Sequence, residues 1–256
     1  EERCTIEWLL VPWAQDILGA LDRGDVRLSD YQMSQWRLMH IGAQPVPPSL
    51  IKHWMSYFPH HQYDTNYGLS ESTGPGCVHL GLGNLHKVGA IGVPGCGWKV
   101  KITDENDQPV PFGQVGELCV KGPGVMVCYY HNPEATAEVL KDGWLHTGDL
   151  AREDEDGYYY MVGRKKNLII LGTGENVSPE ELERKLNACP EVQECVVKEM
   201  GKKIGALICC AEEKQAEVRA FITGLNRTLP LYQRITAVEF SDEPLPRNAM
   251  GKLLRR

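Results

Sequence analysis

The sequence predicts an α/β fold in its first part, short β-strands in its middle and an α+β module in its last part. Residues 6–68 alternate between strand-like apolar runs and an amphipathic helical run, which is the rhythm of a βαβ unit. Between Gly81 and Asp149, Gly, Pro and Asp turns recur roughly every eight to twelve residues, a spacing typical of a small β-barrel or sheet. After Arg164, strand-like and helix-like runs alternate again.

The first region is predicted to run strand, helix, strand. Residues 36–41 form an apolar run that ends at Gly42. A helix is predicted from about Pro48 to Tyr57, and another strand is expected near Gln62.

In the middle region, short strands are predicted over residues 98–102 and 116–120. Residues 104–107 carry an acidic run that is followed by Pro109. We interpret this run as the solvated tip of a hairpin rather than as a metal-binding loop.

The last region opens with a predicted strand over residues 167–171. Ser178 then provides a helix cap, with Pro179 in the first turn and Glu181 placed to reach back to the cap. Further on, a helix is expected over residues 215–225, among strands over residues 194–198, 204–210 and 235–240.

The charge balance excludes several kinds of partner. The chain carries 27 Lys and Arg against 34 Asp and Glu, and its longest basic run is residues 164–166, whereas nucleic-acid binding needs clustered cations. No apolar stretch approaches the ~20 residues of a spanning helix. Acidic residues stand at the N-terminus, where a secretory signal would place basic ones. We expect a cytoplasmic protein with no nucleic-acid partner and no membrane span.

The cysteines and histidines do not form a recognisable metal site. Nine cysteines are scattered without a C-x-x-C pair, which predicts buried reduced thiols. His60 and His61 lie beside Pro59 without a ligand partner at helical spacing, so we do not expect zinc.

Three separated stretches indicate one ATP-using site: residues 67–72 (Tyr-Gly-Leu-Ser-Glu-Ser), residues 143–149 (Gly-Trp-Leu-His-Thr-Gly-Asp) leading to Gly163-Arg164, and residues 246–252 (Pro-Arg-Asn-Ala-Met-Gly-Lys). In this order and at these distances they resemble the adenylate-forming, AMP-binding superfamily of acyl-CoA synthetases, luciferases and peptide-synthetase adenylation domains. The resemblance runs from about Thr5 to the last residue and implies an AMP-forming acyl-CoA synthetase.

The resemblance also implies a domain organisation. Residues 1–164 would form the C-terminal portion of the large AMP-binding domain, a βα unit plus a small β-barrel, and residues 165–256 a small mobile α+β lid domain. Family members carry a Ser/Thr/Gly-rich phosphate loop ending in Lys-Gly well upstream of the first motif, and nothing here matches it. We therefore expect the second half of such an enzyme, inactive alone and partnered by a missing N-terminal half.

The first two motifs supply the nucleotide-binding residues that the resemblance implies. Glu71 would hold Mg²⁺ against the phosphates of ATP, which a hard carboxylate oxygen does well. Tyr67 would lie against the adenine, with Gly68 and Ser70 in the same nucleotide-binding stretch. Asp149 would accept hydrogen bonds from both ribose hydroxyls, since a carboxylate has two acceptor oxygens.

The remaining motifs supply residues for the two reaction steps. Arg164 would lie near the ribose and phosphates, and Lys252 would contact the substrate carboxylate and phosphate during adenylation. In the family, the small domain rotates about the position of Lys166 and exchanges the lysine loop for a segment that lines the thiol's entry path. Here that segment is Gly172, Thr173, Gly174 and Glu175.

The acyl pocket is less well defined. Gly42, Ala43 and Gln44 resemble a Gly-Gly-Ala-Pro turn beside the adenine and acyl group, and the replacements at Ala43 and Gln44 are expected to narrow the pocket. Trp13 and Trp54 could line or narrow an apolar pocket, but core packing is the expected role of both. The sequence does not identify the acid.

The leading interpretation is a fragment of an ATP-dependent carboxylic acid:CoA ligase, placed in fatty acid metabolism, which makes an acyl-adenylate and then an acyl-CoA thioester. Its cofactors and co-substrates would be ATP, Mg²⁺ and coenzyme A. Two alternatives stay open: an adenylation unit that loads a carrier protein, and a non-catalytic nucleotide-binding remnant. The loop after residues 195–197, which borders the CoA site in relatives, is shorter than usual, so the thiol acceptor is open too, as is assembly into a homo-oligomer.

Overall fold

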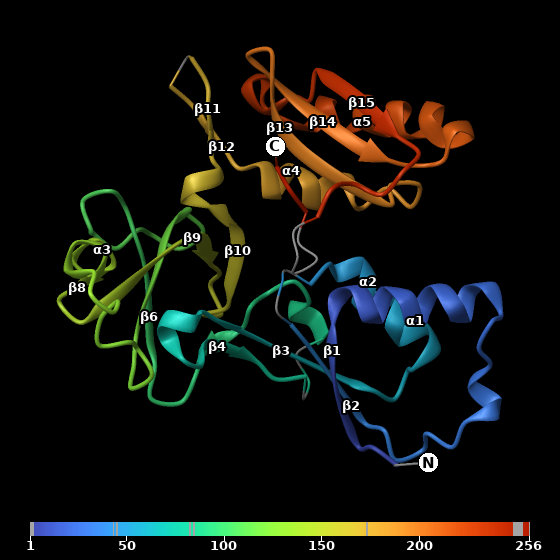
Figure 1. Ribbon diagram of the computed structural model, residues 1–256, viewed down its shortest axis with the longest axis horizontal. Helices are drawn as coiled ribbons and strands as arrows, with labels where there is room; N and C mark the ends of the chain where they lie inside the picture. Colours follow the sequence, from blue (N-terminus) through green and yellow to red (C-terminus); the bar gives the residue numbers. More distant parts are fainter. Residues whose placement is uncertain are drawn as a thin grey trace. The chain divides into compact units, whose positions relative to one another are not determined.

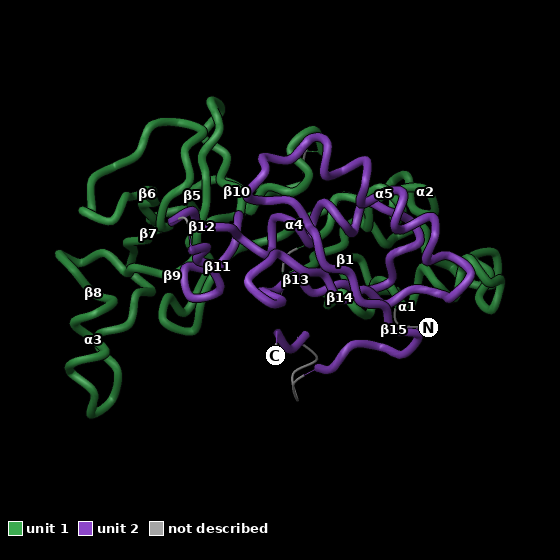
Figure 2. Tube along the Cα trace, turned by 90° about the horizontal axis from the view of Figure 1, so that it is seen from above, with its two compact units in different colours: residues 1–161 green, residues 162–256 purple. Residues whose placement is uncertain are grey.

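The computed structural model describes residues 3–42, 44, 46–81, 83, 85–172, 174–247 and 253–255. The chain divides into two compact units, residues 1–161 and residues 162–256 (Figure 2). Each unit has its own hydrophobic core, so each is described by itself.

The first unit begins with a five-stranded sheet of order β1-β2-β3-β4-β5. Its first three strands are parallel, and β4 and β5 are added antiparallel. Helices α1 and α2 form the crossovers and lie side by side against the sheet (Figure 1). The elements are β1 (Ile6–Leu10), α1 (Val11–Arg23), β2 (Leu38–Gly42), α2 (Pro48–Tyr57), β3 (Gln62–Gly68), β4 (Pro75–His79) and β5 (Val93–Pro94). The predicted βαβ rhythm is confirmed.

Aromatic packing under α2 explains the role of one tryptophan. Trp54 is fully buried, stacks on Phe58 at a centroid distance of 4.6 Å, and donates a hydrogen bond from Nε1 to Nδ1 of His61 at 3.3 Å. Trp13, by contrast, is 55% exposed, so the expectation that it packs in the core was wrong. It lies off the helical stripe through which α1 buries Val11, Ala14, Leu18 and Leu21.

A second, antiparallel sheet follows, with the order β10-β9-β7-β6 and the short strand β8 paired to β9. The predicted strands over 98–102 and 116–120 are confirmed as β6 and β7. The boundary between the two units falls within β10. The elements are β6 (Lys99–Thr103), β7 (Gly116–Lys121), α3 (Pro133–Val139), β8 (Leu140–Lys141), β9 (Trp144–Glu153) and β10 (Tyr159–Arg164).

The turn between β9 and β10 is organised by Asp154. Its carboxylate accepts hydrogen bonds from the Lys87 ammonium at 2.7 Å, from the Tyr158 backbone N–H at 2.9 Å and from the Tyr160 hydroxyl at 3.2 Å. Burial alone would raise the pKa of Asp154, but these hydrogen bonds outweigh it and lower the pKa below the ordinary value. Lys87 also pairs with Asp156 at 2.6 Å.

The second unit pairs a two-stranded hairpin with a three-stranded sheet of order β13-β14-β15. Helices α4 and α5 contribute to its core, whose fully buried members include Leu186 and Ile208. The elements are β11 (Ile169–Ile170), β12 (Asn176–Val177), α4 (Pro179–Leu186), β13 (Glu194–Met200), β14 (Lys203–Cys209), α5 (Gln215–Thr228) and β15 (Ala237–Ser241). The predicted α+β module is confirmed.

Two expectations for local structure need correction. The strand predicted over residues 167–171 is shorter, because residues 165–167 form a 3-10 turn and only Ile169 and Ile170 pair. Among the cysteines, Cys4, Cys96 and Cys128 are exposed rather than buried. Within the described ranges, no helix is long and apolar enough to cross a membrane.

Replacing Ile208 with alanine should lower the free energy of unfolding by about 2–5 kcal/mol, because it removes a fully buried side chain from the core of the second unit. Ile170 is 72% exposed, so Ile170→Ala is the matched control and should change stability by less than about 0.5 kcal/mol. Urea denaturation measures both. Equal losses for the two variants would contradict the described core.

Asp154→Asn should lower stability at neutral pH and lose this effect in acid. Because the folded-state pKa of Asp154 lies below its unfolded value, its contribution is present above the unfolded pKa and disappears as pH falls through the folded one. Denaturation of wild type and variant from pH 7 to pH 3 tests this. Asp156→Asn should have a smaller effect, since Asp156 is 71% exposed. A wild-type-to-variant difference that grows in acid would refute it.

Candidate functional site

The first two motifs meet in the first unit through one hydrogen bond. The hydroxyl of Tyr67, near the end of β3, donates to Oδ2 of Asp149 on β9 at 2.7 Å, although the residues are 82 positions apart. Asp149 is only 2% exposed. Burial and the neighbouring Asp149 charge raise the pKa of Tyr67, so its hydroxyl keeps the proton that it donates. The contact therefore joins the two sheets at a buried carboxylate.

A tight loop follows Tyr67 and carries the rest of the first motif. The strand pairing shifts register between Tyr67 and Gly68, and a Cβ on Gly68 would lie 2.6 Å from the Gly74 carbonyl oxygen, which only glycine avoids. The Ser72 hydroxyl donates toward the Gly74 and Leu69 carbonyls at 2.8 and 3.0 Å. These contacts hold the loop closed with Ser70 exposed on it.

Glu71 is oriented by a residue that sequence reasoning missed. It lies in a 3-10 turn over Ser70–Ser72, and the Tyr129 hydroxyl donates to its Oε1 at 2.8 Å. The Met126 backbone N–H donates to the Glu71 carbonyl at 2.7 Å. Burial and the hydrogen bond to Glu71 raise the pKa of Tyr129. One carboxylate oxygen of Glu71 is thus fixed by a neutral donor.

Of residues 42–44, the segment expected beside the adenine and acyl group, the structure describes Gly42 and Gln44. Gly42 is buried at the end of β2, and Gln44 is half-buried. Ala43 lies outside the described residues.

Gly163 and Arg164 lie at the end of β10, just after the start of the second unit at Val162. A Cβ on Gly163 would lie 2.2 Å from Oγ of Ser178, whose hydroxyl donates to the Val162 carbonyl at 2.8 Å. The glycine of this motif is therefore required by the close approach of the helix cap. Arg164 is exposed and belongs to the second unit, whereas Asp149 belongs to the first. Lys166, also exposed, lies in the following 3-10 turn.

Gly172, Gly174 and Glu175, from the segment expected at the thiol's entry path, lie between β11 and β12. The Leu171 backbone N–H donates to the Glu175 carbonyl at 3.0 Å, and Gly174 adopts the left-handed conformation with φ of +95°. Gly172 is exposed, and Thr173 lies outside the described residues. Within the described part of the chain, Oε2 of Glu175 is buried without a hydrogen-bond partner.

The third motif is anchored on both sides of its lysine. Lys252 itself lies outside the described residues, but an antiparallel bridge joins Arg247 to Leu253, and the Leu254 backbone N–H donates to the Pro246 carbonyl at 2.8 Å. Arg247 forms an ion pair with Glu194 on β13.

Arg255 provides the second anchor. Its guanidinium pairs with both carboxylate oxygens of Glu183 on α4 and lies 3.3 Å from Oε1 of Glu180. Oε1 of Glu180 also accepts a hydrogen bond from Asn167 at 2.6 Å. Burial raises the pKa of Glu183, and Arg255 opposes that rise. The end of the chain is thereby tied to the segment next to Lys166.

Metal ligands do not gather in the described ranges: no three His, Cys, Asp or Glu side chains lie together as a metal site would require. A single carboxylate such as Glu71 can still bind Mg²⁺ when substrate phosphates supply the other ligands.

The chain is similar in sequence to AMP-forming CoA ligases. A family model described as "AMP-binding enzyme" matches residues 1–130. A feruloyl-CoA synthase from Amycolatopsis sp is 36% identical over 87% of this chain and 46% of its own length. A long-chain-fatty-acid–CoA ligase from Escherichia coli O6:H1 is 35% identical over 89% of this chain and 41% of its own length. The chain thus spans less than half the length of these curated relatives.

Solved structures show the same likeness. The anthranilate CoA ligase AuaEII in complex with anthranoyl-AMP matches with a TM-score of 0.84 and 27% identity, over 98% of this chain and 48% of that one. The o-succinylbenzoate coenzyme A synthetase MenE from Bacillus subtilis, in complex with ATP and magnesium ion, matches with a TM-score of 0.81 and 26% identity, over 99% and 51%. The predicted fold class is confirmed by these matches.

Tyr67→Phe should lower the free energy of unfolding by roughly 1–3 kcal/mol, because it removes the 2.7 Å hydrogen bond that a buried carboxylate accepts from the Tyr67 hydroxyl. The control is Tyr130→Phe, which alters a side chain that is 88% exposed and should leave stability within about 0.5 kcal/mol. Chemical denaturation compares the two. A Tyr67→Phe variant as stable as wild type would contradict the described contact.

Proposed function

Because the chain belongs to the AMP-binding enzyme family, we propose that it is part of an ATP-dependent carboxylic acid:CoA ligase. This enzyme would make an acyl-adenylate and then an acyl-CoA thioester. The observation that carries the proposal is the hydrogen bond between Tyr67 and Asp149, which joins two separate motifs at one buried carboxylate. The similarity to CoA ligases supports coenzyme A, rather than a carrier protein, as the thiol acceptor.

Asp149 is proposed to receive the ribose of ATP. A carboxylate offers two acceptor oxygens, which suits two neighbouring hydroxyls. The Tyr67 hydroxyl already donates to Oδ2, so the ring of Tyr67 is held beside the position where the nucleoside would lie. Aromatic faces stack on nucleobases, and we assign the adenine to Tyr67. Gly42, Ala43, Gln44, Gly68 and Ser70 complete the proposed nucleotide-binding set.

Glu71 is proposed to hold Mg²⁺ together with the phosphates. Adenylation joins a carboxylate to the α-phosphate, so the site must neutralise the charge of two anions. When bound, Mg²⁺ would supply that neutralising charge. Tyr129 donates to one oxygen of Glu71 and so orients the carboxylate without adding charge of its own. Arg164 is proposed to contribute a further cation near the ribose and phosphates.

The two steps are proposed to use two faces of the second domain. We assign residues 1–164 to the large domain and residues 165–256 to a mobile domain that rotates at Lys166. Lys252 would contact the carboxylate and phosphate in the first step. In the second step, the turn formed by Gly172, Thr173, Gly174 and Glu175 would face the incoming thiol.

The acid is proposed to be a fatty or aromatic carboxylic acid, since feruloyl-CoA synthase and long-chain-fatty-acid–CoA ligase are among the relatives. A role in fatty acid metabolism, a cytoplasmic location, an N-terminal half as partner and assembly into a homo-oligomer stay predictions from the sequence.

In the full-length enzyme, Lys252→Ala should slow adenylation by about 10²–10³-fold, because it removes a charge contact made mainly in the transition state. Thioester formation from supplied acyl-AMP should be largely retained. Pyrophosphate release with ATP, Mg²⁺ and a panel of fatty and aromatic acids measures the first step. Acyl-CoA formation from synthetic acyl-AMP measures the second.

Glu175→Ala is the matched control for Lys252→Ala. It lies on the face assigned to the thiol, so it should impair mainly the second step. Equal damage to both steps by Lys252→Ala would show that the two-face assignment is wrong. Wild-type enzyme that releases no pyrophosphate with any acid of the panel would count against the ligase function itself.

A further inference from the structure

The strand that carries Asp149 contains a bulge. Strands β7 and β9 are antiparallel, with Glu117 opposite Leu150 and Cys119 opposite His146. Between these pairs, the three residues 147–149 of β9 lie opposite the single residue Leu118 of β7. Such bulges redirect side chains and are frequent next to active sites. Asp149 owes its direction to this bulge, of which it is the last residue.

The bulge needs support, because its backbone groups do not follow the regular ladder. Gly148 adopts the left-handed conformation with φ of +70°, which suits glycine. The Thr147 hydroxyl donates to the Leu118 carbonyl at 2.6 Å and accepts from the Asp149 backbone N–H at 3.1 Å. One side chain thus replaces part of the missing strand pairing next to Asp149.

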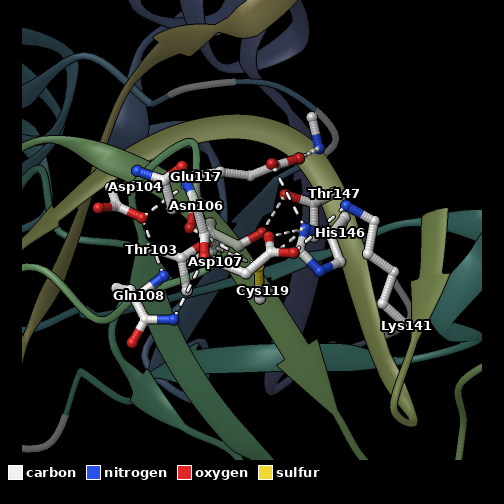
Figure 3. A network of polar contacts seen from close by, with 12 residues as sticks. Thr103, Asp104, Asn106, Asp107, Gln108, Glu117, Cys119, Lys141, His146 and Thr147 are labelled. Atoms are coloured by element: carbon white, nitrogen blue, oxygen red, sulfur yellow. Dashed lines mark hydrogen bonds and ion pairs between the residues drawn. The ribbon is translucent and has the colours of Figure 1, made fainter. Parts of the chain in front are cut away.

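Glu117 provides the other support (Figure 3). Its Oε1 accepts a hydrogen bond from the Gly148 backbone N–H at 3.0 Å, and its Oε2 lies 3.4 Å from Nδ1 of His146. Glu117 is 9% exposed, and the imidazole of His146 also lies 3.5 Å from Sγ of Cys119. A single buried carboxylate therefore contacts β9 at His146, before the bulge, and at Gly148, within it.

We propose that Glu117 is a positioning residue for the nucleotide: by holding the Gly148 N–H, it aims the Asp149 carboxylate at the ribose. The inference rests on the proposed function, in which Asp149 receives that sugar. Asp149 is then held at its backbone N–H by Thr147 and at its carboxylate by the Tyr67 hydroxyl, while Glu117 holds the backbone N–H of the preceding residue, Gly148. Recognition of two neighbouring hydroxyls depends on this direction, because both carboxylate oxygens have to face the sugar.

The test compares ATP with 2′-deoxy-ATP as substrates of the full-length enzyme. Wild type should have a lower KM for ATP than for 2′-deoxy-ATP, because 2′-deoxy-ATP lacks one hydroxyl that Asp149 would bind. Glu117→Ala should raise the KM for ATP roughly tenfold and lower the ratio of the KM for 2′-deoxy-ATP to the KM for ATP by a similar factor. This is the effect expected when one charge-assisted hydrogen bond is lost. A purely structural role would lower stability without changing the preference between the two nucleotides.

Two further variants make the result independent of folding problems at Glu117→Ala. Glu117→Gln keeps an acceptor for the Gly148 N–H and should retain most of the preference for ATP. Thr147→Val keeps the side-chain shape but removes both hydroxyl contacts, so it should lose preference as Glu117→Ala does. Glu105→Gln, an exposed change in the β6–β7 hairpin, is the matched control and should equal wild type.

Unchanged nucleotide preference in folded Glu117→Ala and Thr147→Val would overturn the positioning role. Equal KM values for ATP and 2′-deoxy-ATP in wild type would overturn it as well, because Asp149 would then not read the ribose. In that second case pyrophosphate release by wild type would still support the ligase function, so the two failures can be told apart.

Discussion

The hydrogen bond from Tyr67 to Asp149 is the contact on which the proposed site depends. It crosses from the mixed sheet β1–β5 to the antiparallel sheet β6–β10 and joins them at a buried carboxylate. A buried charge without partners would be costly, so the surrounding donors have to be in place before any ligand binds. Tyr67 supplies one such donor, and the bulge held by Glu117 and Thr147 brings the carboxylate to it. The first unit thus preorganises the direction of one acceptor group.

In the second unit, ion pairs hold the chain on both sides of Lys252. Arg247 pairs with Glu194 on β13, and Arg255 pairs with Glu183 on α4. Glu183 is largely buried and also accepts a hydrogen bond from the Val197 backbone N–H at 2.8 Å, so this anchor is set into the core rather than on the surface. These two anchors lie on either side of Lys252 in the sequence, the residue proposed to act in only one of the two steps.

Sequence patterns predicted most helices and strands, but they did not predict which side chains distant in sequence contact one another. The helix expected from Pro48 to Tyr57 has those bounds in the structure, because proline marks its start and the apolar positions face one sheet. The prediction of a strand over 167–171 was wrong at its start, because Asn167 belongs to a 3-10 turn. Tyr129 and Glu117 were missed because their partners are distant in sequence. For Glu117 a signal did exist, since it is the one charged residue within the buried run Gly116–Val120.

The most direct measurement is a crystal structure of the full-length enzyme with AMP bound. We expect both ribose hydroxyls within hydrogen-bonding distance of the Asp149 carboxylate, the adenine against the ring of Tyr67, and the Gly148 N–H still bonded to Glu117. Nucleotide bound away from Asp149, or ribose hydroxyls that contact other groups and not the Asp149 carboxylate, would contradict the proposed site.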